Sequence, residues 1–484
     1  MNKFLAHTRS IFDTKASLFL PVLLLIYLCS HLPYMQVPAS GNHVWRQCNT
    51  LAVARNYYEE DMRILYPRVD KRYNKSGITG PQFTAYDWTL AAIYKVFGFS
   101  ETAHRWLSLF IMMAAIWAMY LLAFQYSGNR MISGVAASFL AFVPELYYHS
   151  INAVPDILSL AAMLWAWFLG RKWVQTGNNW ACIASAILFA LAGMVKMQFL
   201  VAGIAVGVEF LSARKFGLKR MFQATVLILI AVIPTIWWYS YAANLVKIYG
   251  LHEFVHAMRH ARNMLEFFTI LGQTLFLDLP ETLVGYGFLV FFVFGIWISK
   301  KYWMQFPGLL AYAIGCALFY FLVQYQFIHH GYYAIIFFPI FALTVGVGFY
   351  KISQTRYALL LAFIWIAPFW AWMRMHQNWE IQHSRYPAAF VRQSFRDSAS
   401  KLSDSATRWV VGPDETGCVY FYFLHAKGYP WDTPNIATDA LAKYHEQGAG
   451  GFITNDTVSL HKAAGNLKLV KVGEVDGFIW YRIP

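Results

Sequence analysis

Long apolar stretches, each bounded by charged or turn-forming residues, recur along the chain from Leu18 onward. A helix that crosses a bilayer needs about 20 predominantly apolar residues, so stretches of this kind predict membrane spans. The candidate spans are residues 18–34, 107–126, 131–148, 154–168, 180–194, 197–211, 221–243, 283–299, 306–327, 332–350 and 357–373. We therefore expect a mainly α-helical protein, a polytopic membrane helix bundle of about 11 spans within residues 1–373.

Lys and Arg residues between these spans predict the orientation of the bundle. If the N-terminus is cytoplasmic, alternation of the spans places on that side Lys3, Arg9, Lys15, Arg130, Arg171, Lys172, Arg214, Lys215, Lys219, Arg220, Lys300, Lys301, Lys351 and Arg356. The short loops on the other side, residues 149–153 and 328–331, contain no Lys or Arg. Since cytoplasmic loops carry the excess of Lys and Arg, we expect a multi-pass protein of the cell inner (plasma) membrane.

Residues 180–211 are compatible with two paths. They form either one long helix or two short helices that meet at Lys196. A single helix would place the later basic loops outside, against the charge rule. The charges therefore favour a broken hairpin with Lys196 at its outer end.

Three longer segments then face the outside. They are residues 35–106, called the first outer loop below, residues 244–282, and residues 374–484, called the tail. Residues 83–97 have the aromatic and aliphatic character of a helix that lies in the membrane interface. Residues 37–39 resemble a signal-peptide cleavage site, but the preceding apolar stretch is long enough to remain as an anchor.

The tail differs in composition from the rest of the chain. Strand-like runs are found at residues 409–411, 419–423, 451–454 and 478–482, separated by Gly, Pro and Asp turns. A helical pattern lies between them at residues 438–446. We expect the tail to form a small extracytoplasmic α/β domain.

Composition excludes other classes of protein. The chain of 484 residues is 58% hydrophobic and 13% charged, with a mean hydropathy of +0.40, whereas soluble domains carry about 25% charged residues. The net charge of +14 comes mostly from residues between spans, so it does not predict a nucleic-acid partner. The five cysteines are scattered without a CxxC pair, which argues against a disulfide framework and a structural zinc site.

The first outer loop concentrates basic residues where the topology rule disfavours them. They are Arg46, Arg55, Arg68, Lys71, Arg72 and Lys75. The planar fork of Arg binds phosphate oxygens in pairs, so this cluster predicts contact with a lipid phosphate. The alternative is that these charges only touch anionic headgroups.

Several short motifs resemble a known family. They are His43-Val44-Trp45-Arg46-Gln47, Tyr66-Pro67-Arg68-Val69-Asp70, Thr79-Gly80-Pro81-Gln82-Phe83, Val154-Pro155-Asp156 and His329-His330-Gly331-Tyr332-Tyr333. The first outer loop in particular resembles bacterial membrane glycosyltransferases of family 39, in the C-type superfamily of protein mannosyltransferases and the aminoarabinose transferase that acts on lipid A. The resemblance implies a helix bundle with an outward cavity that binds a polyprenyl-phosphate-linked sugar donor. The sugar would pass to a glycan, lipid or protein acceptor, in contact with membrane lipids.

The general base of such a transfer is left open. Members of the family usually carry a carboxylate at the start of the first loop, whereas this chain has His43 and Val44 there. The candidates are His43, Asp70, Asp87 and Asp156. We favour His43, because an unperturbed imidazole titrates near neutral pH. A hydrogen-bonded structural role is the alternative for His43, and a carboxylate favoured by the helix dipole is the alternative for Asp156.

The remaining candidate residues would bind substrate. They are Trp45, Arg46, Gln47, Arg55, Tyr66, Arg68, Lys196, His329, His330, Tyr332 and Tyr333. Lys196 either reaches towards the interface or meets the carrier phosphate. Adjacent histidines point in different directions on a helix, so His329 and His330 are a poor metal pair. No cofactor is predicted with certainty, a divalent metal is possible, and no metal ligands are assigned.

The predicted function is therefore an inverting membrane glycosyltransferase that uses a polyprenyl-phosphate donor. Two alternatives remain. A transporter or lipid flippase would show paired halves and interrupted helices deep in the bilayer, which this chain does not show clearly. A glycan polymerase or ligase would use related chemistry with a lipid-linked oligosaccharide donor.

Overall fold

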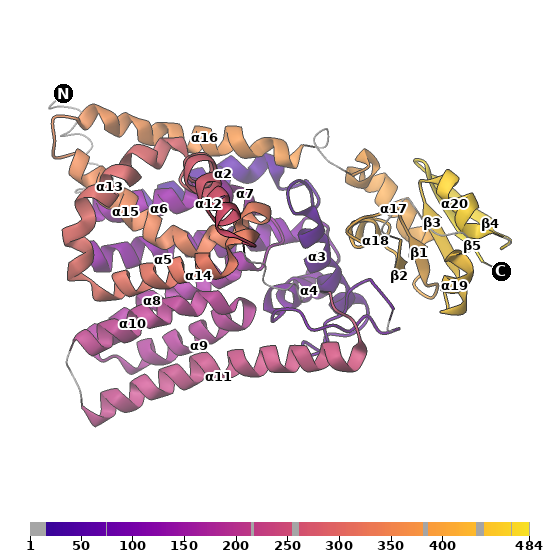
Figure 1. The fold of residues 1–484 in the computed structure, drawn as a ribbon, viewed down its shortest axis with the longest axis horizontal. Helices are drawn as coiled ribbons and strands as arrows, with labels where there is room; N and C mark the ends of the chain where they lie inside the picture. The colour runs from indigo at the N-terminus through magenta and orange to yellow at the C-terminus, as the bar shows by residue number, and fades with distance from the viewer. Residues whose placement is uncertain are drawn as a thin grey trace. The chain divides into compact units, whose positions relative to one another are not determined.

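The computed structural model describes residues 16–73, 75–213, 217–253, 261–380, 386–431, 440–465 and 467–483 (Figure 1). The chain divides into two compact units. Unit 1 consists of Met1–Met35, Arg105–Tyr239 and His256–Gln377. Unit 2 consists of Gln36–His104, Ser240–Val255 and Asn378–Pro484, and thus contains both the first outer loop and the tail.

Unit 1 is a bundle of apolar helices. Its α-helices include α2 (Ala16–His31), α5 (Ala103–Ser127), α6 (Arg130–Phe142), α7 (Pro144–His149), α8 (Asp156–Thr176), α9 (Asn179–Val195), α10 (Val201–Ser212), α11 (Leu218–Tyr249), α12 (Met264–Gln273), α13 (Tyr286–Gln305), α14 (Pro307–His329), α15 (Phe338–Ile352) and α16 (Ile366–Met375). Further segments of 3-10 helix are η1 (Leu32–Tyr34), η2 (Met197–Leu200), η4 (Gly331–Phe337) and η5 (Ala358–Trp365), and η3 (Thr274–Leu283) is a π-helix. Helices α9 and α10 pack on α8, and α6 and α13 pack on α15 (Figure 1).

Each span predicted from the sequence coincides with one of these helices or with two in succession. Within the described residues, six helical stretches are long and apolar enough to cross a membrane: Ala103–Ser127, Asp156–Thr176, Leu218–Tyr249, Pro307–Phe327, Gly331–Ile352 and Ala358–Trp379. Five other apolar helices are shorter: Leu18–Tyr34, Arg130–Phe142, Asn179–Val195, Met197–Ser212 and Tyr286–Ile298. The mainly helical fold with apolar spans is therefore confirmed, whereas the count of about 11 spans stays a prediction.

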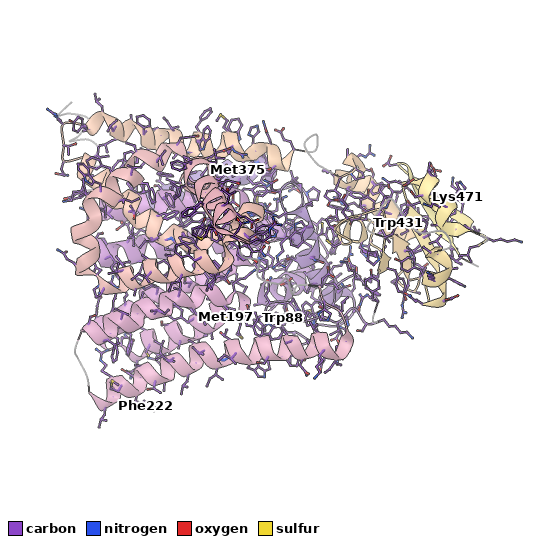
Figure 2. All side chains as sticks on the ribbon, viewed as in Figure 1. Trp88, Met197, Phe222, Met375, Trp431 and Lys471 are labelled. Atoms are coloured by element: carbon purple, nitrogen blue, oxygen red, sulfur yellow. The ribbon has the colours of Figure 1, made fainter. Side chains whose placement is uncertain are left out.

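Large apolar side chains remain exposed on the helices of unit 1. Phe222 on α11 is 70% exposed, and Trp297 on α13 is 79% exposed. Figure 2 shows Phe222 pointing away from its helix. Soluble proteins rarely expose many such side chains together. A lipid environment removes this cost, because hydrocarbon chains take the place of water.

The hairpin predicted at Lys196 is present. Helix α9 ends at Val195, Lys196 has an extended backbone with φ −150° and ψ 107°, and η2 begins at Met197. Gly193 allows the close approach of the neighbouring helix α11, because a Cβ at this position would lie 2.5 Å from Oγ1 of Thr235. The chain therefore reverses at Lys196.

The first outer loop contributes two helices to unit 2. Helix α3 (Val44–Glu59) is polar in sequence yet mostly buried. Helix α4 (Ala85–Phe97) covers the segment predicted to lie in the interface, and Val96 and Phe97 at its end are 74% and 83% exposed. A buried polar helix requires partners for its charged side chains, and these partners come from the loop itself and from the tail.

The tail contributes to unit 2 a small sheet with helices, the α/β character that the sequence predicts. Its strands are β1 (Trp409–Val411), β2 (Gly428–Pro430), β3 (Gly451–Thr454), β4 (Val470–Val475) and β5 (Phe478–Arg482), and its helices include α17 (Gln393–Leu402), α18 (Val419–Phe423), α19 (Ala440–Glu446) and α20 (Thr457–Ala464). The sheet order is β2-β1-β3-β5-β4, with β1 parallel to β2 and β3 and with β5 antiparallel to β3 and β4. A core cluster that includes Val410, Trp431 and Phe452 packs within this domain.

One of the predicted strands is wrong. Residues 419–423 form helix α18 instead of a strand, and all of its side chains are buried. Asp414 sets this turn, because its carboxylate accepts hydrogen bonds from the amides of Thr416 (3.0 Å) and Tyr420 (2.9 Å). The aromatic, β-branched pattern therefore reflects burial in this segment and not strand pairing.

The first outer loop pairs with the open edge of the sheet at β2. The amide of Gly428 donates to the carbonyl oxygen of Asp70 (3.0 Å), and the amide of Arg72 donates to the carbonyl oxygen of Gly428 (2.7 Å). Unpaired sheet edges are open to aggregation, and covering them is a common protection. The loop thus protects this edge.

The predicted topology can be tested by labelling single cysteines. In a variant without native cysteines, we expect Val458→Cys in the tail, an 82% exposed position, to react with a membrane-impermeant maleimide in intact spheroplasts. Gln175→Cys, exposed at the end of α8, should react only after the membrane is permeabilised. If both variants react only after permeabilisation, the number of spans between the two positions is wrong by an odd number. The reverse of the expected pattern would show that the orientation is inverted.

Candidate functional site

The residues predicted from the sequence divide between the two units. Unit 2 contains His43, Trp45, Arg46, Gln47, Arg55, Tyr66, Arg68, Asp70 and Asp87. Unit 1 contains Asp156, Lys196, His329, His330, Tyr332 and Tyr333.

His43 immediately precedes helix α3 and adopts a left-handed backbone conformation with φ of 57°. Its carbonyl oxygen accepts hydrogen bonds from the amides of Arg46 (2.9 Å) and Gln47 (3.2 Å). Left-handed backbone is rare for residues other than Gly, but His, Asn and Asp adopt it more readily than most. Backbone geometry therefore gives a second reason for a histidine at this position.

The residues after His43 bind the loop to itself and to the tail. A guanidinium nitrogen of Arg46 donates to the side-chain oxygen of Gln82. Gln47 donates from its amide nitrogen to a main-chain carbonyl of the same loop (2.8 Å). The carbonyl oxygen of Trp45 accepts a weak bond from the thiol of Cys418 (3.4 Å) in the tail.

Arg55 and Asp70 form a buried ion pair. Nη2 of Arg55 lies 2.7 Å from Oδ2 of Asp70, and their side chains are 1% and 3% exposed. Asn56 donates to the other carboxylate oxygen (3.1 Å), and Arg55 donates to the carbonyl oxygen of Tyr422 (2.8 Å). Burial acts to lower the pKa of Arg55, but Asp70 and Glu59 raise it above its ordinary value. Asp70 therefore holds the loop against the tail.

Asp87 differs from Asp70 in the hydrogen bonding of its carboxylate. Within the described residues, Oδ2 of Asp87 is buried and has no hydrogen-bond partner. Burial raises the pKa of Asp87 to about 7, against the weaker opposing effect of Arg46. A carboxylate with a pKa near neutral pH is suited to proton transfer.

Tyr66 is half-buried and lies on a separate, mostly apolar cavity. This cavity of about 570 Å³ is lined by residues 62–66 and by Trp88. The guanidinium of Arg63 lies 5.1 Å from the ring centre of Tyr66, within the range of a cation–π contact.

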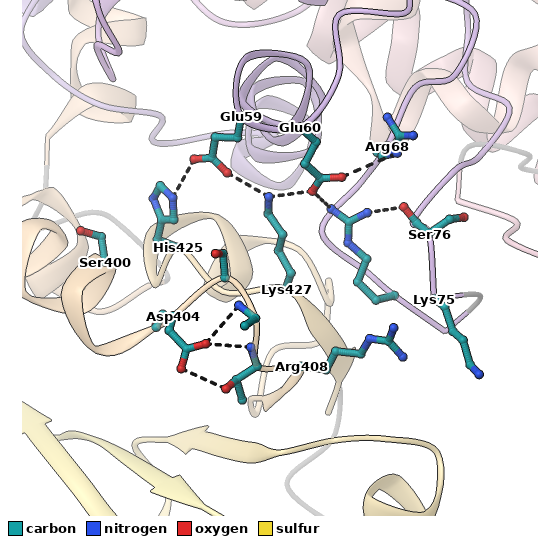
Figure 3. Close-up of a pocket in the computed structure, with 15 residues that line it drawn as sticks. Glu59, Glu60, Arg68, Lys75, Ser76, Ser400, Asp404, Arg408, His425 and Lys427 are labelled. Atoms are coloured by element: carbon teal, nitrogen blue, oxygen red, sulfur yellow. Dashed lines mark hydrogen bonds and ion pairs between the residues drawn. The ribbon is translucent and has the colours of Figure 1, made fainter.

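A larger polar cavity of about 900 Å³ lies between the first outer loop and the tail within unit 2 (Figure 3). Glu59 and Glu60, at the end of α3, contribute carboxylates to it. Nζ of Lys427 lies 2.9 Å from Glu59 and 2.8 Å from Glu60, and His425 lies 2.8 Å from Glu59. The tail thus supplies cations to the acidic end of the helix.

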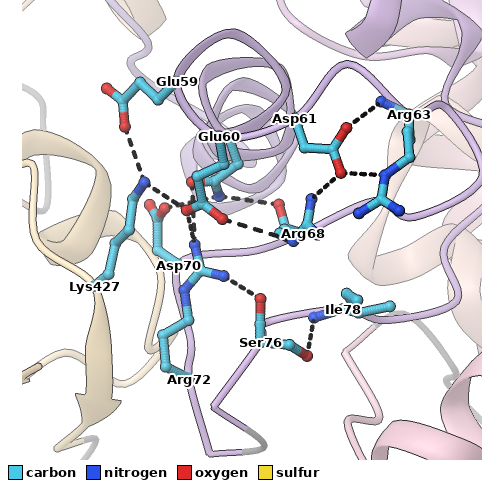
Figure 4. Close-up of polar contacts among 11 residues, drawn as sticks. Glu59, Glu60, Asp61, Arg63, Arg68, Asp70, Arg72, Ser76, Ile78 and Lys427 are labelled. Carbon is cyan, nitrogen blue, oxygen red and sulfur yellow. Dashed lines mark hydrogen bonds and ion pairs between the residues drawn. The ribbon is translucent and has the colours of Figure 1, made fainter. Parts of the chain in front are cut away.

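Most basic residues of the first outer loop also have carboxylate partners (Figure 4). Arg68 lies 3.6 Å from Glu60 and 3.4 Å from Asp61, and Arg72 pairs with Glu60. Lys71 lies 2.9 Å from Glu253. These pairs, like that of Arg55, give the cluster a structural role beside the predicted contact with phosphate.

Unit 1 brings five of the predicted residues together. Nζ of Lys196 lies 3.5 Å from Oδ1 of Asp156, 5.9 Å from the ring centre of Tyr332 and 5.7 Å from that of Tyr333. The ring of His330 stacks at 5.4 Å on Tyr332. The side chain of His329 lies outside the described residues. The result is a cation between a carboxylate and aromatic rings, beside the break in the hairpin.

Sequence reasoning missed the partners of these residues. Glu59, Glu60 and Asp61 form an acidic run that precedes the basic residues of the same loop, so charge complementarity was a readable signal. Tyr422, His425 and Lys427 in the tail carried no such signal, because they are more than 300 positions distant along the chain.

A metal centre has no candidate in the parts of the chain that the structure describes. No three His, Cys, Asp or Glu side chains lie close enough together there to hold a metal ion. The identity of any metal ligands therefore stays unassigned.

Comparisons with known proteins agree with the resemblance found in the sequence. Residues 84–238 match the family of dolichyl-phosphate-mannose-protein mannosyltransferases. No curated protein matches the chain in sequence. Among solved structures, ArnT from Cupriavidus metallidurans bound to undecaprenyl phosphate is similar with a TM-score of 0.63 at 11% identity, over 96% of this chain and 97% of that one.

The oligosaccharyltransferase of Archaeoglobus fulgidus is a further structural relative. Its complex with Zn and sulfate has a TM-score of 0.56 at 14% identity, over 90% of this chain and 67% of that one. The archaeal AglB in complex with an inhibitory peptide and a dolichol-phosphate has a TM-score of 0.56 at 12% identity, over 92% and 69%. The resemblance to the C-type superfamily is confirmed by the matched segment and by the shared fold.

Removal of the Asp70 charge should destabilise unit 2. We expect Asp70→Asn to lower stability by about 3–5 kcal/mol, because it leaves the Arg55 guanidinium buried without its counter-ion. Asp476→Asn is the matched control, because the side chains of Asp476 and its partner Arg392 are 38% and 56% exposed and such pairs contribute about 0–1 kcal/mol. Thermal unfolding of the detergent-solubilised protein measures both, and equal melting temperatures would contradict the structural role of Asp70.

Proposed function

We propose that this chain is a C-type membrane glycosyltransferase that transfers a sugar from a polyprenyl-phosphate carrier to an acceptor hydroxyl outside the cytoplasm. The acceptor is a glycan, a lipid or a protein. The named ligands of the structural relatives, undecaprenyl phosphate and a dolichol-phosphate, support this class of carrier. The observation that carries the proposal is the pair of Asp156 and Lys196 beside Tyr332 and Tyr333 in unit 1.

Sugar transfer from a phosphate carrier requires a cation for the departing phosphate and a base for the acceptor hydroxyl. In the proposed step, the acceptor oxygen forms a bond to C1 of the sugar while the bond from C1 to the phosphate oxygen breaks. Asp156 accepts the hydroxyl proton. The carrier phosphate leaves with the bonding electron pair, and Lys196 stabilises its charge. Attack from the face opposite the phosphate inverts the configuration at C1.

The environment of Asp156 and Lys196 suits these roles. Within the described residues, Oδ2 of Asp156 is buried without a hydrogen-bond partner. Lys196 is 16% exposed at its side chain, so one side of it is open to a ligand. A phosphate bound to Lys196 would replace Asp156 as its counter-ion. The carboxylate would then be released from Lys196 and free to contact the acceptor hydroxyl.

Asp87 is the rival base. Its raised pKa of about 7 and its unpartnered oxygen are the properties expected of a general base. We favour Asp156 because Nζ of Lys196 lies 3.5 Å from its carboxylate, beside two tyrosine rings. Arg46, the cation that acts on Asp87, donates to Gln82. Asp70 is less suited, since both of its oxygens accept hydrogen bonds.

A second candidate function is transfer of a whole oligosaccharide. The likeness in fold to an archaeal oligosaccharyltransferase favours it. A donor assay separates the two, because the first function transfers one sugar from a carrier monophosphate and the second requires a lipid-linked oligosaccharide. Lipid transport without a new glycosidic bond would instead indicate the flippase alternative.

Variants of the proposed pair should lose turnover while the protein still folds. We expect Asp156→Asn to lower the single-turnover rate by roughly 10²–10⁴-fold, the usual cost of losing a general base. Lys196→Ala should lower it by about 10²–10³-fold through loss of charge stabilisation, and should also reduce the polyprenyl phosphate that copurifies. Lys247→Ala, an exposed lysine at the end of α11, is the matched control. Full activity of Lys196→Ala would remove the assignment.

The pH dependence of turnover distinguishes Asp156 from the rivals. A base with a pKa of about 7 gives a rate that rises with pH through that value, because only its ionised form accepts a proton. We expect Asp87→Asn to keep turnover within about tenfold and to leave the pH profile in place. A rising limb near pH 7 that is present in the unmodified protein and disappears in Asp87→Asn, together with loss of turnover, would assign the base to Asp87. His43→Asn tests in the same assay whether the imidazole acts as the base, because asparagine tolerates the left-handed backbone of this position.

A further inference from the structure

The polar cavity of unit 2 has an excess of positive charge (Figure 3). It is lined by Glu59, Glu60, Arg68, Arg72, Lys75, Ser76, Ser400, Ser403, Asp404, Ser405, Ala406, Thr407, Arg408, His425 and Lys427. Five Arg and Lys side chains therefore face three carboxylates. The pKa of His425 is lowered by the charge of Arg55 and by burial, so the imidazole adds little charge near neutral pH.

The carboxylates of this cavity are already neutralised. Glu59 and Glu60 pair with Lys427, and Glu60 also pairs with Arg72. Burial acts to raise the pKa of Glu59, but the hydrogen bond from His425 and the charges of Arg55 and Lys427 hold it well below its usual range. Glu59 therefore stays ionised, and both carboxylates have their counter-ions.

Asp404 is occupied within its own turn. Its carboxylate accepts hydrogen bonds from the amides of Ala406 (3.0 Å) and Thr407 (2.8 Å) and from the hydroxyl of Thr407 (2.9 Å). It also pairs with Arg482. Asp404 is therefore unavailable to the other cations of the cavity.

Two of the cationic side chains that line the cavity lack a counter-ion of this kind in the described part of the chain. The side chains of Arg408 and Lys75 have no ion-pair or hydrogen-bond partner among the residues that the structure describes, and no dashed line leads from either in Figure 3. Arg408 is half-buried beside β1, and Lys75 is exposed on the first outer loop. An arginine that is partly removed from water and lacks a counter-ion is a site for an anion.

The rest of the lining limits the kind of anion. Among the described residues, Ala406 is the only apolar one that lines the cavity, so acyl or polyprenyl chains have no matching surface. Serine and threonine hydroxyls also line the cavity, and hydroxyl groups both donate and accept hydrogen bonds. A volume of about 900 Å³ far exceeds one phosphate ion and falls within the range of small-molecule sites, roughly 300–1,000 Å³.

We infer that this cavity binds an anionic saccharide, a short sugar chain that carries a carboxylate or a phosphate. The hydroxyl groups of the sugar rings match the serine and threonine rim, and the anionic group pairs with Arg408 and Lys75. The inference concerns binding by unit 2 alone. It does not depend on the transfer chemistry assigned to Asp156 and Lys196.

The test measures binding of trigalacturonate, a trisaccharide of uronic acids, to the full chain in detergent by isothermal titration calorimetry. Neutral maltotriose, inorganic phosphate and vesicles with anionic headgroups are the comparison probes. We expect trigalacturonate to bind at least tenfold more tightly than maltotriose and phosphate, with an affinity that falls as salt is added. Equal binding of phosphate would show that the cavity binds anions without recognising a sugar, and would overturn the inference. Tighter binding of the vesicles would overturn it as well.

Variants locate the binding to the cavity. Arg408→Ala should weaken trigalacturonate binding about tenfold, because a charge-assisted hydrogen bond is lost. Lys75→Gly should weaken it as well, and glycine accepts the left-handed backbone of this position (φ 67°) without strain. Arg392→Ala, an exposed arginine of the tail that pairs with Asp476 outside the cavity, is the matched control. Unchanged binding in Lys75→Gly and Arg408→Ala, with normal melting temperatures, would place the saccharide elsewhere and refute the inference.

Discussion

A charge that is buried must find an opposite charge, and the architecture of unit 2 follows from that requirement at Arg55. Arg55 belongs to helix α3, whose residues are almost all buried, and its guanidinium is removed from water. Water cannot stabilise it there, and an unpaired charge in such a place would cost several kcal/mol. Asp70 from the same loop and the carbonyl oxygen of Tyr422 from the tail supply its partners. One arginine therefore links two segments that are far apart in the chain.

The same requirement changes the interpretation of the basic residues in the first outer loop. From the sequence they form a cationic cluster beside the membrane, suited to a lipid phosphate. In the fold Arg68, Lys71 and Arg72 each lie beside a carboxylate. A cation with a near counter-ion attracts a further anion less strongly. Lys75 and Arg408 are left to act as anion ligands, and both line the polar cavity.

Unit 1 is limited by a different constraint, the need to satisfy every backbone polar group in hydrocarbon. Its helices meet that need internally, and the chain departs from helix at Lys196. Such a break exposes backbone groups and is tolerated where it lines a polar region. Asp156 and two tyrosine rings surround the lysine there. The irregular backbone and the candidate chemistry therefore coincide.

The sequence by itself determined the positions of the apolar helices of unit 1, the strands at residues 409–411, 451–454 and 478–482, and the break at Lys196. Hydrophobic period, turn residues and the placement of Lys and Arg are local signals, so they can be read along the chain. Helix α18 was misread because its aromatic pattern reports burial and not the kind of element. Only the tertiary structure decided which charges are paired. The partners of Arg55 and Glu59 include Tyr422, His425 and Lys427, and contacts between such distant residues leave no periodic trace in a single sequence.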